Sequence, residues 1–287
     1  MRRKQFGWLM LIVGVTTALW VNELARGWWT IGHETITEAA AAGLPDEMPL
    51  FFRAGGKVLA GMVGDPDRWK NRTANFLKIA EAPNHFLDLE DLENNPLPKD
   101  RYAATQLLIK LGKDPATVGF LPYAILEGVD KLAVAFYDYR NDKKNPANEM
   151  KCLVYAGILA HYTTDAAMPL HTTRDYDGRT IDGMKQQKGI HAKIDGFPEK
   201  NGFTVEEVMR GLQARKIDDP WGYVLQFIQE SHKHVSRCYD LDAEGAFDRA
   251  TPESRAFIME RCRAGAQFTM DLWYHAWLRS ATMPKHY

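Results

Sequence analysis

Apolar residues recur at helical spacing along most of the chain. Six segments place apolar side chains three and four residues apart, as a helix does when it buries one face. They are residues 34–42, 101–111, 124–139, 149–166, 222–239 and 252–278. Alternation typical of strands is confined to short stretches. The pattern therefore predicts an all-α fold.

Segments rich in Gly, Pro, Asn and Asp separate the predicted helices. The main ones are residues 93–100, 141–148 and 174–187, and these residue types favour turns and loops. The chain has 287 residues, of which 45% are hydrophobic and 25% charged, as in folded globular proteins. No repeat and no linker interrupts it. We therefore expect residues 28–287 to form one multi-helix domain.

The first 27 residues have the layout of a secretory signal peptide. Basic residues Arg2, Arg3 and Lys4 precede an apolar run of about 16 residues, and the small residues Ala25 and Gly27 follow it. Cleavage after Gly27 would leave a tryptophan at the new N-terminus and a secreted or periplasmic protein. The alternative is an uncleaved membrane anchor, because the apolar run is only slightly shorter than a membrane span.

Charge and cysteine content exclude two classes of protein. The formal net charge is −1, and loss of residues 1–27 would remove four basic and one acidic residue, which makes the remainder more acidic by three charges. A protein that holds duplex phosphates by charge needs clustered Lys and Arg, so this is no basic nucleic-acid clamp. Cys152, Cys238 and Cys262 permit at most one internal disulfide, which excludes a disulfide scaffold.

The segment AHYTTDAAMPLH, residues 160–171, carries the sharpest chemical signal. His161 and Asp165 are four residues apart at the end of a predicted helix and share one helix face. Pro169 stops the helix, so His171 lies on the following turn and can fold back toward that face. Zinc prefers such nitrogen and oxygen donors. A surface hydrogen bond is the ordinary role of a single His/Asp pair, but the apolar surroundings argue against it here.

Further histidines and carboxylates lie in order along the chain. His191 and Asp195 repeat the four-residue spacing, PNHFLD contains His85, Phe86 and Asp88, GDPDRW contains Asp65 and Asp67, and His33 lies near the predicted mature N-terminus. Each fragment could be a capped turn or a packed side chain, whereas together they indicate a metal centre. His232, His234, His275 and His286 have no such partners. The chain has no Gly-x-Ser-x-Gly turn, Walker loop or dinucleotide fingerprint.

In this order, the motifs from Trp28 to Asp195 resemble the superfamily of zinc-dependent phospholipase C and the single-strand-specific zinc nucleases. The resemblance implies an all-α zinc phosphodiesterase with three zinc ions. It implies that the amino group and carbonyl oxygen of Trp28, with His33 and Asp165, bind one zinc. Asp65, His85, His161 and again Asp165 would bind a second zinc, and His171, His191 and Asp195 a third. Asp165 would then bridge two ions.

The resemblance also implies roles outside the ligand set. Arg68 lies three residues after Asp65, as an arginine does in the nuclease branch, and its guanidinium could neutralise a phosphate oxygen; the alternative is a solvated surface charge. Phe86 and Asp88 resemble nuclease positions that bind a base, but the phospholipases have a similar string. Asp65 and Asp67 both remain candidate ligands, and Asp65 is preferred because of its spacing to Arg68.

The two branches of the superfamily imply different substrates. The five-residue spacing from Trp28 to His33, together with Asp195 and Arg68, favours the nucleases. The segment after His171, which ends in Gly-Ile-His, and the acidic charge favour the phospholipases. The cysteines do not reproduce the nuclease disulfides. We therefore expect a phospholipase C-like enzyme acting on phospholipid, with single-stranded nucleic acid as the alternative substrate.

A different class of function is also compatible with the sequence. Zinc could stabilise the fold of a membrane-anchored binding or structural protein without catalysis. That hypothesis requires residues 1–27 to be retained. In either case the sequence indicates no obligate protein partner, and we expect a monomer.

Overall fold

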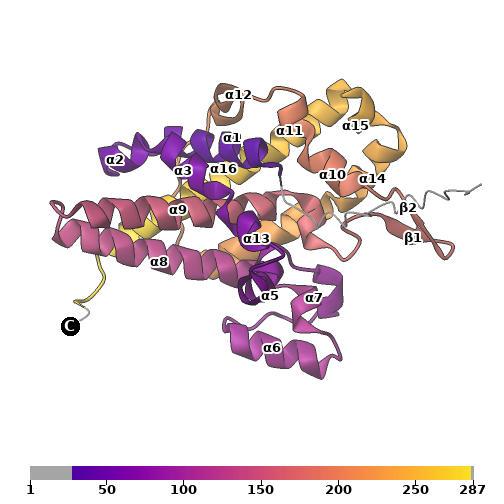
Figure 1. Cartoon of the computed structure of the whole chain (residues 1–287), viewed down its shortest axis with the longest axis horizontal. Coiled ribbons are helices and arrows are strands. Elements are labelled where there is room, and N and C mark those ends of the chain that lie inside the picture. Colours follow the sequence, from indigo (N-terminus) through magenta and orange to yellow (C-terminus); the bar gives the residue numbers. More distant parts are fainter. Residues whose placement is uncertain (1–27, 286–287) are drawn as a thin grey trace, which may run out of the picture.

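The computed structural model describes residues 28–285, so the predicted signal peptide, residues 1–27, lies outside the described residues. The described chain is almost entirely helical (Figure 1), which confirms the predicted all-α class. Its longest helices are Leu121–Asn141 (α8), Pro146–Ala167 (α9) and Pro252–Ser280 (α16). None of the described helices combines the length and the apolarity needed to cross a membrane.

Shorter elements surround these three helices. The first half of the chain contributes Thr30–Ala42 (α1), Leu50–Arg53 (α2), Gly56–Val63 (α3), Asp65–Trp69 (α4), Asn75–Glu81 (α5), Arg101–Lys110 (α6) and Pro115–Val118 (α7). The second half contributes Ile190–Asp195 (α10), Phe197–Lys200 (α11), Val205–Met209 (α12), Pro220–Lys233 (α13), Val235–Ala243 (α14) and Ala246–Arg249 (α15). Three 3-10 turns are Ala82–His85 (η1), Leu89–Leu92 (η2) and Pro169–Thr172 (η3). Arg179–Ile181 (β1) and Met184–Gln186 (β2) form an antiparallel hairpin.

Local sequence sets where the two central helices begin. The side chain of Asn145 accepts a hydrogen bond from the backbone N–H of Ala147 at the start of α9, with Pro146 in the first turn. Thr251 accepts from the N–H of Ser254 at the start of α16. Such caps satisfy backbone donors that have no partner within the helix. Both helices therefore start where the sequence supplies a capping side chain.

Helix α9 lies at the centre of the packing. It contacts α8 and α16 along its length, and α1 and α3 cover another side (Figure 1). The indole of Trp273 donates to the carbonyl oxygen of Ala156 at 3.2 Å, and its ring packs edge-on against Phe52 with 5.5 Å between centroids. Burial of such aromatic side chains contributes roughly 1.5–3 kcal/mol each. This packing fixes the last turns of α9 deep inside the molecule.

Apart from short helices that the sequence pattern does not predict, such as α3 and α5, the structure differs from the prediction in two segments. The helix predicted over residues 222–239 is two helices, because the chain turns at His234, whose backbone N–H bonds to the carbonyl of Ser231, three residues back, and thereby ends α13. The turn directs α14 toward α15 and η3. The predicted loop 174–187 contains the β1–β2 hairpin, in which Gly183 adopts a positive φ that favours glycine. All three cysteines are buried free thiols.

Candidate metal centre

The last turns of α9 carry two of the predicted ligands. His161 and Asp165 are fully buried and lie on one face of the helix, four residues apart. The helix ends at Ala167 ahead of Pro169, and η3 then brings in His171. Nδ1 of His171 lies 3.8 Å from Oδ1 of Asp165. The proline therefore folds the chain back, so that the two imidazoles and the carboxylate share one volume.

Eight side chains from distant segments form three adjoining groups. Within each group, one nitrogen or oxygen atom per residue lies within 4.8 Å of the others. The groups are His33, His161 and Asp165; Asp67, His85 and His161; and His171, His191 and Asp195. Imidazole nitrogens and carboxylate oxygens at such separations can surround a zinc ion, which binds them at about 2.0–2.2 Å.

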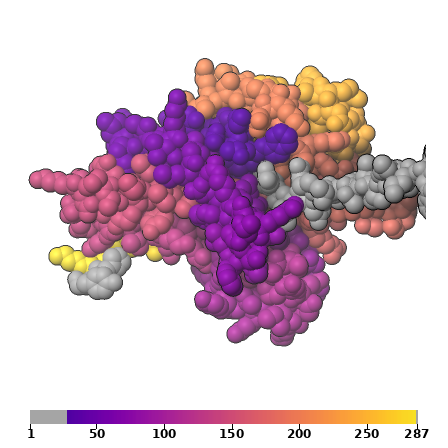
Figure 2. Space-filling view, in the orientation of Figure 1, coloured from indigo at the N-terminus to yellow at the C-terminus, as the bar shows by residue number. Residues whose placement is uncertain are grey.

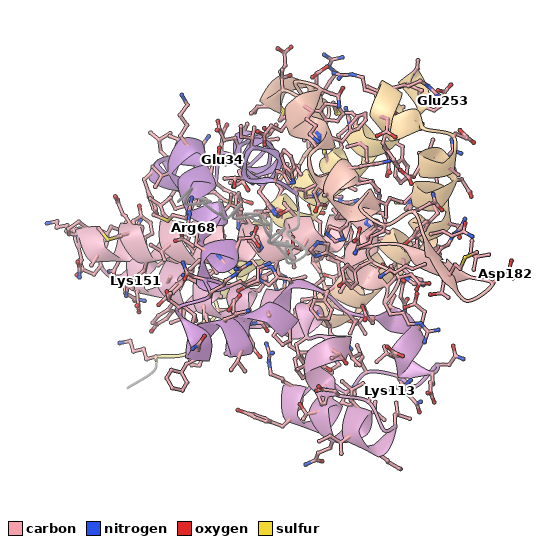
Figure 3. All side chains as sticks on the ribbon, turned by 45° about the vertical axis from the view of Figure 1, so that its right-hand side comes forward. Glu34, Arg68, Lys113, Lys151, Asp182 and Glu253 are labelled. Carbon is pink, nitrogen blue, oxygen red and sulfur yellow. The ribbon has the colours of Figure 1, made fainter. Side chains whose placement is uncertain are left out.

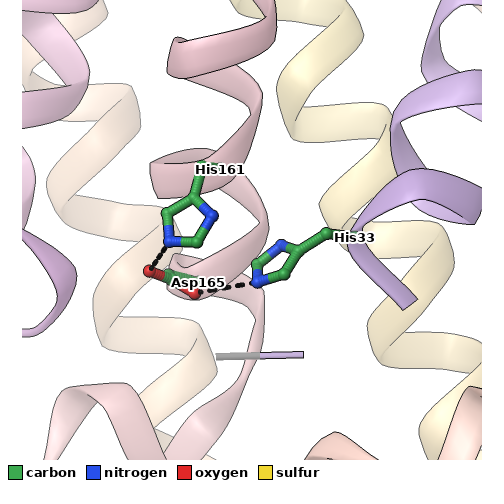
Figure 4. A group of neighbouring side chains, drawn as sticks. All are labelled: His33, His161 and Asp165. Atoms are coloured by element: carbon green, nitrogen blue, oxygen red, sulfur yellow. Dashed lines mark ion pairs between the residues drawn. The ribbon is translucent and has the colours of Figure 1, made fainter. Parts of the chain in front are cut away.

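Asp165 faces two groups, one with each oxygen. Its Oδ2 lies 3.0 Å from Nδ1 of His85 and 3.2 Å from Nε2 of His161. Its Oδ1 lies 3.5 Å from Nε2 of His33, and Figure 4 shows His33 and His161 meeting the carboxylate from two sides. A carboxylate placed in this way can bridge two cations.

The outward ring nitrogens of three imidazoles bond to backbone carbonyls. Because a carbonyl oxygen only accepts, these Nδ1 atoms must carry a proton, so that Nε2 is the nitrogen that offers a lone pair to a metal when the ring is neutral. The three bonds are His161 to Val63 at 2.8 Å, His171 to His85 at 2.6 Å and His191 to Tyr176 at 3.1 Å. Backbone contacts therefore set both the orientation and the tautomer of these rings.

The hydroxyl of Thr164 sets the orientation and the tautomer of His33. Its hydroxyl lies 2.6 Å from Nδ1 of His33 and donates back to the carbonyl of Ala160 at 2.8 Å. With its own proton engaged in this way, the hydroxyl oxygen accepts from Nδ1 of His33. Nε2 of His33 is then the nitrogen that faces Asp165.

Buried polar atoms of the groups fit a metal-binding role. Among the described residues, five atoms of these side chains have no hydrogen-bond partner and no close ion pair: His33 Nε2, His85 Nε2, Asp165 Oδ1, His171 Nε2 and Asp195 Oδ1. An unsatisfied buried polar atom costs roughly 1–3 kcal/mol. Several of them in one volume are explained if cations take their lone pairs. The donor set therefore fits zinc.

Burial dominates the electrostatics of the centre. It lowers the pKa of His33 and His85 to about 3 and that of His171 to about 4, so these rings are neutral near pH 7. It raises the pKa of Asp195 to about 7. Burial also acts to raise the pKa of Asp165, but the neighbouring histidines outweigh it and hold that pKa well below its usual range.

These pKa shifts predict that the metal-free protein loses stability in mild acid. When unfolded, His33, His85 and His171 take up protons below about pH 6.5, which the folded protein resists, whereas Asp195 holds a proton only when folded. Near pH 5 the unfolded state therefore binds about two more protons than the folded state, and the free energy of unfolding there falls by about 3 kcal/mol for each pH unit of acidification. Urea titrations of chelator-treated protein between about pH 6.5 and 5 measure the slope. An unchanged or rising stability would contradict the shifts.

The structure places Asp67, and not Asp65, in the second group. Oδ1 of Asp67 lies 3.8 Å from Nε2 of His161 and 4.0 Å from Nδ1 of His85. Asp65 instead pairs with Arg68 at 2.7 Å, and the two side chains are 40% and 58% exposed. The preference for Asp65 as ligand is therefore not supported by the geometry. Both residues lie in α4, where two positions of difference turn the side chain to another face.

The same two-residue shift changes the candidate cation. Arg68, labelled in Figure 3, forms an exposed ion pair with Asp65. Lys70 lies three residues after Asp67, and its ammonium is 2.6 Å from the Asp67 carboxylate. Its side chain is only 7% exposed. The buried positive charge beside the metal groups is therefore Lys70. Lys70 was not identified from the sequence, because Arg68 had the expected spacing to Asp65.

Trp28 lies beside the first and third groups. Its side chain is fully buried, and its indole donates to the carbonyl of Thr164 at 3.1 Å. The next residue, Trp29, donates its N–H to the carbonyl of Asp195 at 3.2 Å. Gly32 in α1 allows close contact with Trp28, since a Cβ at position 32 would lie 3.1 Å from Cβ of Trp28. That the amino group and carbonyl oxygen of Trp28 bind zinc stays a prediction.

The segment containing Phe86 and Asp88 is held against the centre. The N–H of Leu87 donates to the carbonyl of His171 at 2.9 Å, and His171 donates back to His85. Phe86 is half-buried, whereas Asp88 is buried, and that burial raises the pKa of Asp88 to about 8. Their role in binding a substrate stays a prediction.

Two contacts of the centre had no clear sequence signal. The hydroxyl of Tyr162 donates to Glu81, and Oε1 of Glu81 lies 3.7 Å from Nε2 of His85. The Tyr162 ring also packs edge-on against His85 and His161. In the sequence Tyr162 looks like any other buried aromatic residue, and only these long-range contacts connect it to the centre. Glu81 and Tyr162 therefore form an outer layer that positions His85.

The histidines outside the predicted set lie elsewhere. Nδ1 of His232 donates to the carbonyl of Thr172 at 2.9 Å, and Nδ1 of His275 donates to that of Ile217 at 3.1 Å. His234 ends α13. These three belong to none of the described metal groups, and His286 lies outside the described residues.

Comparison with known proteins finds similar structures but no similar sequences. No protein-family model and no curated protein matches the chain. One similar structure is the alpha-toxin of Clostridium perfringens, avian strain SWCP, with a TM-score of 0.46 and 14% identity over 89% of this chain. Another is the alpha toxin of Clostridium absonum, with a TM-score of 0.45 and 11% identity over 91% of this chain. The chain spans 65% of the length of each toxin.

Proposed function

We propose that the chain is a zinc-dependent phosphodiesterase of the phospholipase C type. One observation carries the proposal: three donor groups adjoin, and the carboxylate of Asp165 faces two of them. A structural zinc site is normally closed by four protein ligands, whereas a catalytic site keeps a position open. The group of His171, His191 and Asp195 offers three donors. Such a group has room for a water molecule or a substrate oxygen.

The chain's own residues would bind and orient a phosphodiester at this centre. Adjacent zinc ions lower the pKa of bound water toward neutrality and polarise a phosphoryl oxygen. Lys70 supplies a buried positive charge next to Asp67 and can hold a second phosphoryl oxygen. The neutral rings of His33, His85 and His171 present lone pairs at neutral pH. The burial of the whole set excludes bulk water and strengthens these interactions.

The proposal includes export and removal of residues 1–27. The tryptophan that cleavage would expose is already buried beside the metal groups through its bond to Thr164. A free amino group there would add one more nitrogen donor. Edman sequencing of protein from the native host should therefore begin at Trp28. Retention of Met1 would instead favour a membrane-anchored protein in which zinc only stabilises the fold.

The substrate is tested by incubating zinc-loaded protein beginning at Trp28 with phosphatidylcholine and, separately, with single-stranded DNA. We expect release of phosphocholine and no DNA cleavage, because the chain is acidic overall, whereas proteins that hold a single-stranded backbone do so with a positively charged groove. Chelator-treated protein is the control and should be inactive. Cleavage of DNA alone would favour the nuclease branch, and cleavage of neither substrate would contradict a phosphodiesterase.

A further inference from the structure

Helix α5 exposes apolar side chains to solvent, outside the hydrophobic core. Phe76 is 94% exposed, Ile79 is 74% exposed and Leu77 is 42% exposed, and Phe76 is the most exposed large hydrophobic residue of the described chain. Phe76 and Ile79 are three residues apart and therefore lie on the same side of the helix. Transfer of each side chain out of water would contribute roughly 1.5–3 kcal/mol. The outer side of α5 is thus suited to an apolar surface.

Basic residues lie next to Phe76 and Ile79 in the sequence, between the acidic residues Asp65 and Asp67 on one side and Glu81 on the other. Between residues 68 and 80 the charged side chains are all basic: Arg68, Lys70, Arg72 and Lys78. The first two pair with aspartates of α4, whereas Arg72 and Lys78 flank Phe76 in sequence. A short helix with exposed aromatic and aliphatic residues flanked by cations is typical of segments that lie in the interface of an anionic membrane. Exposed apolar side chains with cations beside them therefore fit the surface of an anionic bilayer, which offers both an apolar interior and phosphate groups.

Helix α5 is joined directly to the metal centre. It continues into η1, which ends at His85. At the same junction the carboxylate of Glu81 is held by Tyr162, which packs against His85 and His161. Figures 1 and 2 show the segment of α5 to α7 as a lobe projecting from the helical body. A surface that contacts α5 is therefore held next to the metal groups.

We propose that α5 is a membrane-binding element that inserts Phe76 and Ile79 into the surface of a bilayer containing anionic lipid. Leu77, which is 42% exposed, lies around the helix from Phe76 on the side away from Ile79, outside the inserted face. The exposed side chain of Arg72 contacts the lipid phosphates, and the long side chain of Lys78 reaches them from another face of the helix. Binding by this element does not require the metal ions. Its consequence for catalysis, delivery of bilayer phospholipid to the centre, rests on the proposed function.

The test is co-sedimentation of the full chain from residue 28 with vesicles of phosphatidylcholine and phosphatidylserine. We expect the protein to bind, with or without zinc, and the variant F76S/I79S to bind at least about tenfold more weakly, since two inserted apolar side chains are lost. The matched control is L50S/M150S, which removes two apolar residues that are 70% and 63% exposed on α2 and α9. This control should bind like the unmodified protein.

A second variant separates charge from apolar insertion. R72Q/K78Q should lose the preference for vesicles with phosphatidylserine over vesicles of phosphatidylcholine alone, because the two cations nearest to Phe76 in sequence are removed. Failure of the unmodified protein to sediment would overturn the proposal. Equal binding by F76S/I79S, or an equal loss in L50S/M150S, would also overturn it. So would a self-association in lipid-free buffer that F76S/I79S abolishes, since a second copy would then be the partner.

Hydrolysis of the water-soluble diester bis(p-nitrophenyl) phosphate separates this inference from the proposed function. F76S/I79S should hydrolyse it at the rate of the unmodified protein while losing about tenfold or more on vesicle lipid. If no variant hydrolyses the diester but vesicle binding depends on Phe76 and Ile79, the phosphodiesterase proposal fails and the membrane element stands. If the diester is hydrolysed but vesicle binding is insensitive to Phe76 and Ile79, the membrane element fails alone.

Discussion

We expect Asp165→Asn to abolish diester hydrolysis and to lower the zinc content by two ions. The reason is that the two carboxylate oxygens of Asp165 face different groups, with Oδ2 near His85 and His161 and Oδ1 near His33. An amide has the same shape but no negative charge to bridge two cations. Changes outside the ligand shell commonly cost 10–100-fold, so we expect this change to cost more than about a hundredfold. Elemental analysis and initial rates on bis(p-nitrophenyl) phosphate measure both effects.

The matched control for this variant is Asp130→Asn. Asp130 is an exposed aspartate that pairs with Arg279 at the surface, and its side chain is 62% exposed. Exposed ion pairs contribute roughly 0.2–1 kcal/mol, so the control should keep its zinc and its rate. Full zinc content and full activity in Asp165→Asn would contradict the bridging role. Circular dichroism of both variants shows whether the fold is retained.

We expect Lys70→Met to lower diester hydrolysis by about a hundredfold to a thousandfold, the usual effect of removing one electrostatic stabiliser of a reacting oxygen. Methionine keeps most of the buried volume and removes the charge that lies 2.6 Å from Asp67. Arg68→Met is the matched change at the neighbouring exposed cation, and we expect it to alter the rate by less than about threefold. Rates at saturating and limiting substrate, with zinc content, separate loss of catalysis from loss of metal.

Substitution of the aspartates that pair with these cations tests which of the two binds zinc. Asp67→Asn should lose zinc from the second group, whereas Asp65→Asn should keep it, because only Asp67 approaches His85 and His161. If Arg68→Met and Asp65→Asn are the damaging changes instead, Asp65 is the ligand and the arrangement of α4 described above is wrong.

Short-range spacing was enough to predict part of the centre. A four-residue interval on a helix fixes two side chains on one face, and this holds for His161 with Asp165 and for His191 with Asp195. Pro169 likewise fixes the end of α9 and the return of the chain at His171. In these segments local geometry and tertiary structure agree. The helical class of the fold follows from the same periodicity.

The remaining features depend on contacts between distant segments. Asp65 and Asp67 each have a basic residue three positions later, so spacing alone cannot choose between them. Only the approach of α4 to η1 and α9 brings Asp67 near the histidines. The hydrogen bond from His33 to Thr164 joins residues 131 apart, and no local pattern indicates it. The exposure of Phe76 likewise depends on which side of α5 the rest of the fold covers.

Anomalous diffraction at the zinc absorption edge, from crystals of the protein beginning at Trp28, tests the central claim most directly. We predict three peaks, one between His33 and Asp165, one among Asp67, His85 and His161, and one among His171, His191 and Asp195. The first two should lie on opposite sides of the Asp165 carboxylate. Zinc peaks only at other sites, or none in zinc-soaked crystals, would contradict a multinuclear centre at the end of α9.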